Sequence, residues 1–361
     1  SLPHVGPNPG AGGGGPYWCG FFVQAPWRTY VNYNDPRLIE KYYSQMKEWF
    51  KYVDKYKVDG LLKRWPDTKY RDWYLGDWLA PMGVDAGNQA SVDLVSNCFI
   101  SECLSTMYKT AITLGKREEA EEFAMRREKL NKLIHQTFYR EDEGIYSTGS
   151  QLDMCYPMLV GVVPDSLYNK VKENVVAMTE EKYKGHIAVG LVGVPILTEW
   201  AVRNKQVDFF YQMMKKRDYP GYLYMIDHGA TATWEYWSGE RSRVHNCYNG
   251  IGTWFYQAVG GIRLDEAKPG YRHFYVDPQI PNGVTWAKVT KESPYGTIAV
   301  NWKLKDDNQL NLQLTVPAGT TATVCIPNNA VSCKKNKKKV SVKEQTVDVE
   351  AGHYDFLFNL K

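Results

Sequence analysis

Apolar side chains recur every three or four positions through most of the chain before Gly261. This spacing is typical of amphipathic helices. Residues 36–53 and 117–138 show it most clearly, and Asn34-Asp35-Pro36 supplies a capping residue and a first-turn proline for the first of them. Short loops between successive helices indicate antiparallel pairs. Further helices are predicted over residues 92–113, 151–160, 165–178, 194–202, 207–215 and 249–259.

The pattern changes after Gly261, where apolar and polar positions alternate in short runs rich in β-formers. Turn sequences such as Asp306-Asp307-Asn308 and Pro317-Ala318-Gly319 separate these runs. We therefore predict a β-sandwich of about 100 residues that closes the chain. Its clearest strands are predicted over residues 298–302, 310–316, 321–326 and 354–358.

Composition narrows the class of protein. Of the 361 residues, 43% are hydrophobic and 23% are charged, which excludes a disordered chain. The 26 Tyr and 12 Trp are a surplus of rings suited to stacking on sugars or bases. The net charge is +4, but five lysines lie within Lys334–Lys339, and without them it would be −1. We expect a solvent-exposed hairpin there and no nucleic-acid partner.

The seven cysteines form no CxxC pair, which favours buried small side chains over a zinc site, a redox motif or a disulfide framework. We expect no metal and no cofactor. No window holds the roughly 18 apolar residues that cross a membrane, so a membrane partner is not expected. Residues 1–15 are rich in Gly and Pro and have no charged-then-apolar signal region. A periplasmic or extracellular location is favoured over a cytoplasmic one.

Three segments combine side chains that suit sugar binding. The densest, residues 221–237, mixes Gly and Thr with aromatic rings and acids, and His245 follows it. In residues 73–79, Asp77 lies beside Trp78 and can accept hydrogen bonds from a polyol. The third is Tyr17-Trp18. The structural alternative for each is plain packing, with Asp77 a capping residue beside a core Trp.

The run Gly229-Ala230-Thr231-Ala232-Thr233-Trp234-Glu235 resembles the glutamate motif of the bacterial α-L-rhamnosidases of glycoside hydrolase family 78. The resemblance covers most of residues 16–330 and keeps the order of the family's segments. One departure is Gly20, where the family often has Asp. The other matching segments are Trp18, Ala25-Pro26-Trp27-Arg28, Gly76-Asp77-Trp78-Leu79, Gly190 to Pro195, His245 and Val259-Gly260-Gly261-Ile262.

The resemblance implies a mainly α (α/α)6 toroid-like barrel followed by an all-β sandwich. It divides the chain into a Gly/Pro-rich loop at 1–15, a catalytic helical domain at 16–261 and a sandwich at 262–361. Such enzymes remove terminal α-L-rhamnose from glycosides or polysaccharides with inversion, and Glu235 matches their general base. The residues expected to line the sugar subsite are Trp18, Asp77, Trp78 and His245, with Tyr224 and Trp234 as second choices.

The resemblance also implies a general acid upstream of Trp18, and residues 1–17 contain no Asp or Glu. About nine helices are predicted where the barrel has six pairs. We therefore expect a chain that begins part-way through the barrel and is inactive by itself. A non-catalytic carbohydrate-binding protein and a related (α/α)6 glycosidase acting on another sugar are the alternatives.

Overall fold

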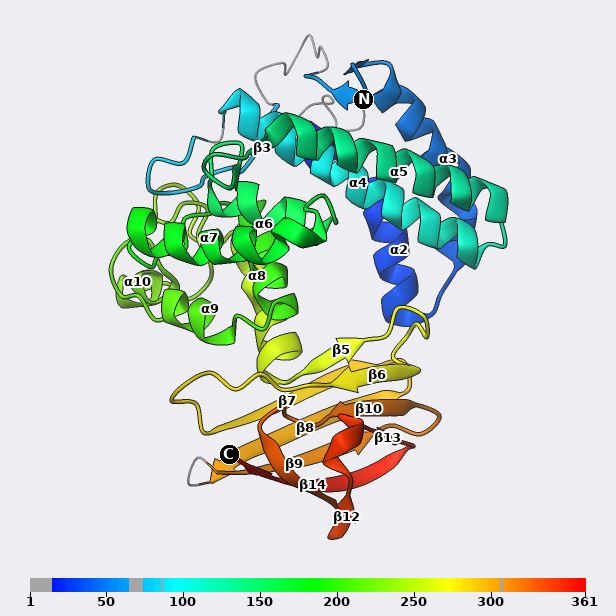
Figure 1. Cartoon of the computed structure of the whole chain (residues 1–361), viewed down its shortest axis with the longest axis vertical. Helices are drawn as coiled ribbons and strands as arrows, with labels where there is room; N and C mark the ends of the chain where they lie inside the picture. The colour runs from blue at the N-terminus through cyan, green and yellow to red at the C-terminus, as the bar shows by residue number, and fades with distance from the viewer. Residues whose placement is uncertain (1–14, 65–73, 86, 306–307) are drawn as a thin grey trace. The chain divides into compact units, whose positions relative to one another are not determined.

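A computed structural model describes residues 15–64, 74–85, 87–305 and 308–361 (Figure 1). The described chain divides into two compact units. One is mainly helical and takes in the described parts of residues 1–27, 39–201 and 209–251. The other combines residues 28–38 and 202–208 with the β-rich stretch 252–361. The Asp306-Asp307 part of the predicted turn and the Gly/Pro-rich residues 1–14 lie outside the described residues.

The helices predicted up to residue 215 are all present, and the prediction for residues 117–138 coincides with α5. Asp35 caps the start of α3, where its Oδ1 accepts the backbone N–H of Arg37 at 3.1 Å. The helices are α1 (Pro16–Cys19), α2 (Phe21–Tyr33), α3 (Arg37–Asp54), α4 (Gln89–Thr113), α5 (Arg117–Phe138), α6 (Gln151–Leu159), α7 (Asp165–Tyr183), α8 (Gly193–Arg203), α9 (Val207–Met214), α10 (Tyr222–Asp227), η1 (Asn249–Ile251), α11 (Gly252–Trp254) and η2 (Phe255–Val259).

Four helical segments differ from the prediction, and the four-residue helix α1 is one that was not predicted. Helix α2 was not predicted, because Pro26 lies inside it and proline ordinarily interrupts a helix. Helix α10 forms within a segment that was interpreted as a loop. Residues 249–259 form a 3-10 turn, one short α segment and a π turn in place of one regular helix.

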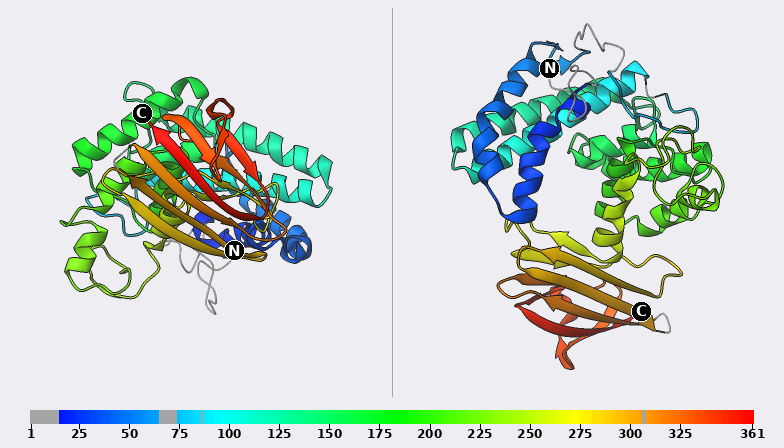
Figure 2. Two further views of the ribbon diagram at one scale, coloured as in Figure 1. Left: turned by 90° about the horizontal axis from the view of Figure 1, so that it is seen from below. Right: turned by 180° about the vertical axis from the view of Figure 1, so that it is seen from behind.

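Consecutive helices pack as antiparallel pairs. Helices α4 and α5 lie side by side along most of their length, with Gly115 at a φ of 73° in the link between them (Figures 1 and 2). A left-handed residue of this kind ends a helix readily because glycine has no Cβ to strain. Helix α4 is buried on nearly every face, unlike the amphipathic α5. An all-round buried helix is expected at the inside of a two-layered helical barrel.

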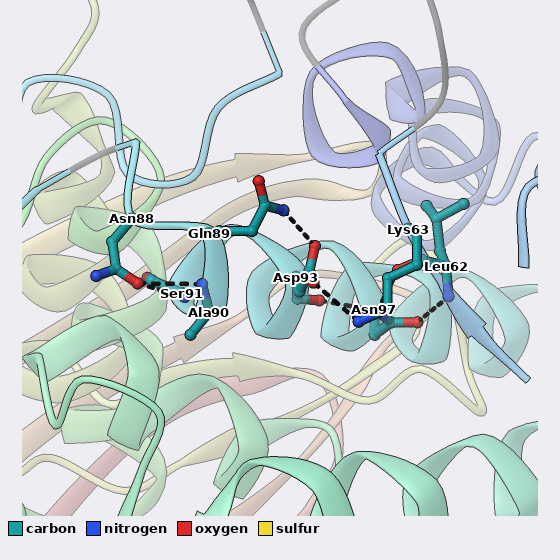
Figure 3. Close-up of polar contacts among 8 residues, drawn as sticks. All are labelled: Leu62, Lys63, Asn88, Gln89, Ala90, Ser91, Asp93 and Asn97. Carbon is teal, nitrogen blue, oxygen red and sulfur yellow. Dashed lines mark hydrogen bonds and ion pairs between the residues drawn. The ribbon is translucent and has the colours of Figure 1, made fainter. Parts of the chain in front are cut away.

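A side-chain cap, Asn88, fixes the start of α4 (Figure 3). The Asn88 side-chain oxygen accepts the N–H groups of Ala90 and Ser91 at 3.1 and 3.3 Å, which satisfies two of the free donors at this helix end.

About two turns further along α4, the buried Asn97 pairs with a short strand (Figure 3). Its side chain accepts the N–H of Leu62 at 2.9 Å and donates to the Leu62 carbonyl at 3.1 Å. Asp93 lies beside it and accepts from Gln89 at 2.7 Å and from Lys63 at 3.1 Å. The fully paired amide holds the strand pair β1 (Lys57–Val58) and β2 (Leu61–Leu62) against α4.

Two mainly antiparallel sheets form the β part of the second unit. The four-stranded sheet has the order β13-β10-β6-β5, and the six-stranded sheet has the order β12-β11-β14-β9-β8-β7 (Figures 1 and 2). Two further short strands, β3 (Tyr139–Arg140) and β4 (Ile145–Tyr146), form a hairpin in the helical unit. The sandwich strands are β5 (Ile262–Leu264), β6 (His273–Val276), β7 (Trp286–Ser293), β8 (Gly296–Lys305), β9 (Gln309–Val316), β10 (Thr321–Cys325), β11 (Ala330–Lys335), β12 (Lys338–Val340), β13 (Thr346–Val349) and β14 (Gly352–Leu360).

The four predicted strands correspond to β8, β9, β10 and β14, and their alternation follows burial. In β9, Leu310, Leu312 and Leu314 are buried while Asn311 and Gln313 are exposed. The Pro317-Ala318-Gly319 turn is present between β9 and β10. Since one face of each strand is buried, a shift of one residue would expose this core, which fixes the register.

The lysine run forms the predicted solvent-exposed hairpin. Strands β11 and β12 pair antiparallel with Lys335 opposite Lys338, and the two turn residues, Asn336 and Lys337, have φ values of 48° and 68°. Such a turn matches the right-handed twist of its strands.

Six of the seven cysteines are buried, and all seven are free. No described helix is long and apolar enough to cross a membrane.

Candidate active site

Glu235 lies on a loop that folds back on itself like a hairpin. The His245 N–H donates to the Thr233 carbonyl at 2.8 Å, and the Glu235 N–H donates to the Ser242 carbonyl at 2.9 Å. The Thr233 hydroxyl closes the loop with a 2.5 Å bond to the His245 carbonyl. These bonds hold the backbone of Glu235 and His245 in one short ladder.

The Glu235 carboxylate is only lightly engaged by its neighbours. Its Oε2 accepts a long 3.4 Å bond from the Ser242 N–H, and its Oε1 lies 4.0 Å from the Arg241 guanidinium. The side chain is 17% exposed, and that of Arg241 is 66% exposed. An ion pair this open to water contributes little to stability. The carboxylate is therefore held at the loop surface with acceptor capacity to spare for a water molecule or a hydroxyl group.

Buried aromatic rings support this loop from beneath. Trp237 and Tyr248 stack with their ring centroids 4.0 Å apart, and the Trp237 indole donates to the Val189 carbonyl at 2.9 Å. The Tyr222 hydroxyl donates to the Tyr248 carbonyl at 2.8 Å, and its ring meets Trp237 edge-on. Trp237, expected in a loop around a sugar, is thus a core side chain.

The Tyr248 hydroxyl joins two of the three segments that the sequence singled out. It lies 3.1 Å from the Glu235 carbonyl and 3.3 Å from the Leu79 carbonyl, so its single proton is shared between them. Burial raises the pKa of this hydroxyl, which keeps it a donor. Tyr248 was missed from sequence, because nothing in its local pattern distinguishes it from a core tyrosine.

Asp77 lies behind the loop surface. It is 3% exposed, and its two carboxylate oxygens accept the N–H groups of Gly190 and Gly193 at 2.7 and 2.8 Å. Its geometry favours a positioning role, in which it holds the turn at residues 190–193, over the predicted contact with a sugar. The close approach also explains Gly190, where a Cβ would lie 2.1 Å from the Trp78 carbonyl oxygen.

Burial raises the pKa of Asp77 from its usual 3.8 to about 7, although the N–H groups of Gly190 and Gly193 oppose the shift. The folded protein therefore binds a proton here between about pH 4 and pH 7 that the unfolded chain does not. Burial also raises the pKa of Asp153, so both groups act in the same direction.

The stability contributed by Asp77 is expected to be full below pH 3.8 and to be lost as the pH rises through 7. Its size is about 4 kcal/mol if the full shift acts. Urea unfolding of the wild type and of Asp77→Asn across pH 4.5–8 measures it, and the variant should show the flatter dependence. Parallel profiles would rule out this role for Asp77.

Trp18 and Trp78 are both half-buried. The Trp18 indole donates to the Leu75 carbonyl at 3.3 Å, and the Trp78 carbonyl accepts the Leu191 N–H at 2.9 Å. The loop that bears Asp77 is therefore tied to α1 on one side and to residues 190–193 on the other. The departure at Gly20 has a packing reason, since a Cβ there would lie 2.3 Å from the Phe99 ring.

The remaining predicted residues differ in exposure. His245 is half-buried, and its Nδ1 accepts the Cys247 N–H at 3.2 Å, which leaves Nε2 as the protonated nitrogen. Tyr224 is half-buried against His228, with ring centroids 4.0 Å apart. Trp234 is 2% exposed and packs on Gly239, so its indole lies in the core beneath Glu235.

The structure thus brings together residues 75–79, 189–193 and 222–248 through the bonds of Asp77, Tyr248 and Trp237. Trp73 lies outside the described residues. Among the described residues, no group of three or more His, Cys, Asp or Glu is arranged to hold a metal ion. What the three segments build is a carboxylate, a half-exposed histidine and half-exposed rings on rigidly tied loops.

Solved structures of α-L-rhamnosidases share this fold. The Streptomyces avermitilis protein, solved in complex with L-rhamnose, superposes with a TM-score of 0.86 at 23% identity, over 97% of this chain and 34% of that one. The protein from Dictyoglumus thermophilum gives a TM-score of 0.85 at 21% identity, over 96% and 40%. The predicted fold is confirmed: a helical (α/α)6 barrel followed by a C-terminal β-sandwich.

Two family models match the sequence. The bacterial alpha-L-rhamnosidase 6 hairpin glycosidase domain matches residues 1–259, and the bacterial alpha-L-rhamnosidase C-terminal domain matches residues 261–341. The chain belongs to the bacterial α-L-rhamnosidase family.

Curated relatives agree with this assignment. An α-L-rhamnosidase of Alteromonas sp. is 26% identical over 92% of this chain, and one of Formosa agariphila is 27% identical over 94%. The matches cover 36% and 38% of those proteins, so the chain spans little more than a third of the length of the relatives it matches.

Proposed function

We propose that this chain takes part in the inverting hydrolysis of terminal α-L-rhamnosyl residues from glycosides or polysaccharides, with Glu235 as the general base. The observation that carries the proposal is the Glu235 carboxylate itself, which is held by its backbone and left lightly bonded at the loop surface. Membership of the bacterial α-L-rhamnosidase family supports the choice of rhamnose as the sugar.

In an inverting reaction, a carboxylate takes a proton from water as the water attacks the anomeric carbon. The Glu235 carboxylate has a free acceptor site for that water, because among the described residues it accepts one long hydrogen bond, from the Ser242 N–H. A second carboxyl group must protonate the leaving oxygen from the opposite face of the sugar, about 6.5–9.5 Å away. We assign that role to no described residue.

The subsite for the cleaved sugar is proposed to be lined by Trp18, Trp78 and His245, with Tyr224 at its edge. The half-buried rings offer apolar faces for a pyranose, and the Nε2–H of His245 offers a donor for its hydroxyl groups. Asp77 and Trp234 are buried, and we propose that they fix the loops that carry these side chains without contacting the sugar.

The domain boundaries proposed are 16–261 for the catalytic helical domain and 262–361 for the β-sandwich. The separation of the two family matches between residues 259 and 261 supports this division. The function is tested by assaying the full-length protein and its Glu235→Gln variant on an aryl α-L-rhamnoside, with other aryl glycosides as controls for the sugar.

Tyr248→Phe is expected to lower kcat several-fold while KM changes little, because Glu235 would lose the bridge that ties its backbone to Leu79. The ring and its stacking on Trp237 remain, so the free energy of unfolding should fall by only about 1 kcal/mol. Steady-state kinetics and urea unfolding measure the two effects. An unchanged kcat would show that the bridge does not position Glu235.

A further inference from the structure

The outer face of the β-sandwich carries an exposed tryptophan among polar side chains. Trp286, in β7, is 60% exposed. Residues directly opposite one another on paired strands share a face of the sheet. Trp286 therefore shares its face with Lys303 of β8 and Asn311 of β9, and the next row holds Lys288, Asn301 and Gln313. These six side chains line a groove of about 440 Å³, which we call the sheet groove.

The sheet groove carries positive charge from Lys288 and Lys303. Among the described residues, neither Lys288 nor Lys303 has an ion pair, so both ammonium groups face solvent. The Trp286 row continues through Leu357 of β14 to Lys334 and Lys339. The acid on the second row, Asp355, is exposed and accepts from Gln313 at 3.2 Å. The face thus suits a ligand that carries negative charge.

We propose that the sheet groove binds a segment of an anionic glycan, one whose sugars carry carboxylate groups. The Trp286 ring offers a face on which a pyranose can stack, and the amides of Asn301, Asn311 and Gln313 can pair with hydroxyl groups. Lys288 and Lys303 attract the carboxylates. Adjacent strands lie about 4.8 Å apart, so the row from β7 to β9 spans roughly 10 Å, a length that takes more than one sugar unit.

A protein partner is disfavoured because Trp286 is the one aromatic ring in the two rows from β7 to β9, where the other five side chains are lysines and amides. Choosing a glycan as the occupant rests on the proposed function. The binding itself does not depend on Glu235, which belongs to the other unit. Failure of the Glu235 assignment and failure of this proposal are therefore distinguishable, since one is read from hydrolysis and the other from binding.

The test measures binding to a soluble rhamnogalacturonan, a polymer of alternating rhamnose and galacturonate, by the chain carrying Glu235→Gln. Trp286→Ala is expected to weaken binding about tenfold, and Trp286→Tyr to restore most of it. The double variant Lys288→Gln/Lys303→Gln should weaken binding by a similar factor at low salt and less at high salt. The same polymer with its carboxyl groups reduced to alcohols should bind weakly to all variants.

The matched control is Lys337→Gln/Lys338→Gln, which removes the same charge from the lysine hairpin and should leave the affinity within twofold. Thermal unfolding confirms that each variant is folded. Unchanged affinity in Trp286→Ala, equal binding of the reduced polymer, or an equal loss in the hairpin control would each overturn the proposal. Equal affinity for a single-stranded oligonucleotide would also overturn the proposal, because it would show that the face binds any anionic polymer able to stack on Trp286.

Discussion

Replacing Glu235 with glutamine in the full-length protein is expected to lower kcat for an aryl α-L-rhamnoside by about 10²–10⁴-fold. Glutamine keeps the shape of the side chain, but its amide cannot take a proton from the attacking water. Within the described part of the chain, the carboxylate makes one 3.4 Å hydrogen bond and one 4.0 Å ion pair. The loss should therefore appear in the rate, with the melting temperature nearly unchanged.

Glu240→Gln is the matched control for this experiment. Glu240 lies five residues further along the same loop and is exposed, so its replacement should leave kcat within about twofold. Near-wild-type hydrolysis by Glu235→Gln would exclude Glu235 as the base. An equal loss in both variants would point to the charge of the loop rather than to one proton acceptor.

Asp77→Ala is expected to lower the free energy of unfolding by about 3–5 kcal/mol. The change leaves the buried N–H groups of Gly190 and Gly193 without an acceptor, at roughly 1–3 kcal/mol each, and adds a small cavity. A typical domain is stable by only 5–15 kcal/mol, so the variant should unfold at markedly lower urea concentration. Activity should fall with it, because the 190–193 turn contacts the Trp78 backbone.

Asp85→Ala provides the comparison for that variant. Asp85 is in the same region of the chain and its carboxylate also accepts a backbone N–H, that of Gly87 at 2.8 Å, but in an exposed turn. Water can replace that bond, so the expected loss is below about 1 kcal/mol. The two losses are measured by urea unfolding at pH 4.5, where the raised pKa of Asp77 has cost the folded protein little stability. Equal losses in the two variants would contradict a special role for the buried pairings of Asp77.

Local pattern was enough to predict most of the fold. Residues 117–138 carry an unbroken apolar stripe that begins just after Gly115, and α5 has those bounds. Helix α2 was missed because the stripe is interrupted by Pro26, which tertiary packing tolerates. The short pattern after Gly261 likewise predicted four strands whose alternation the sandwich core requires.

The contacts within the candidate site could not be predicted from the sequence as well as the fold could. Asp77 and Gly190 are 113 residues apart, and no local signal shows that the carboxylate meets that N–H. A tryptophan in a Gly- and Thr-rich loop reads the same whether it faces a sugar or the core. Trp78 is half-buried whereas Trp234 and Trp237 are buried, and only the packing of Gly239 and Tyr248 against them decides the difference.

The side chains that tie the site loops together bond mainly to backbone atoms of their partners. Asp77 accepts from the N–H of Gly190, Trp237 donates to the Val189 carbonyl, and the Tyr248 hydroxyl contacts the Glu235 carbonyl. A backbone atom is present whatever side chain its residue carries. Exposed loop positions such as Val244 can therefore change identity while the loop path persists, which makes them the natural positions to randomise when selecting for a different glycoside.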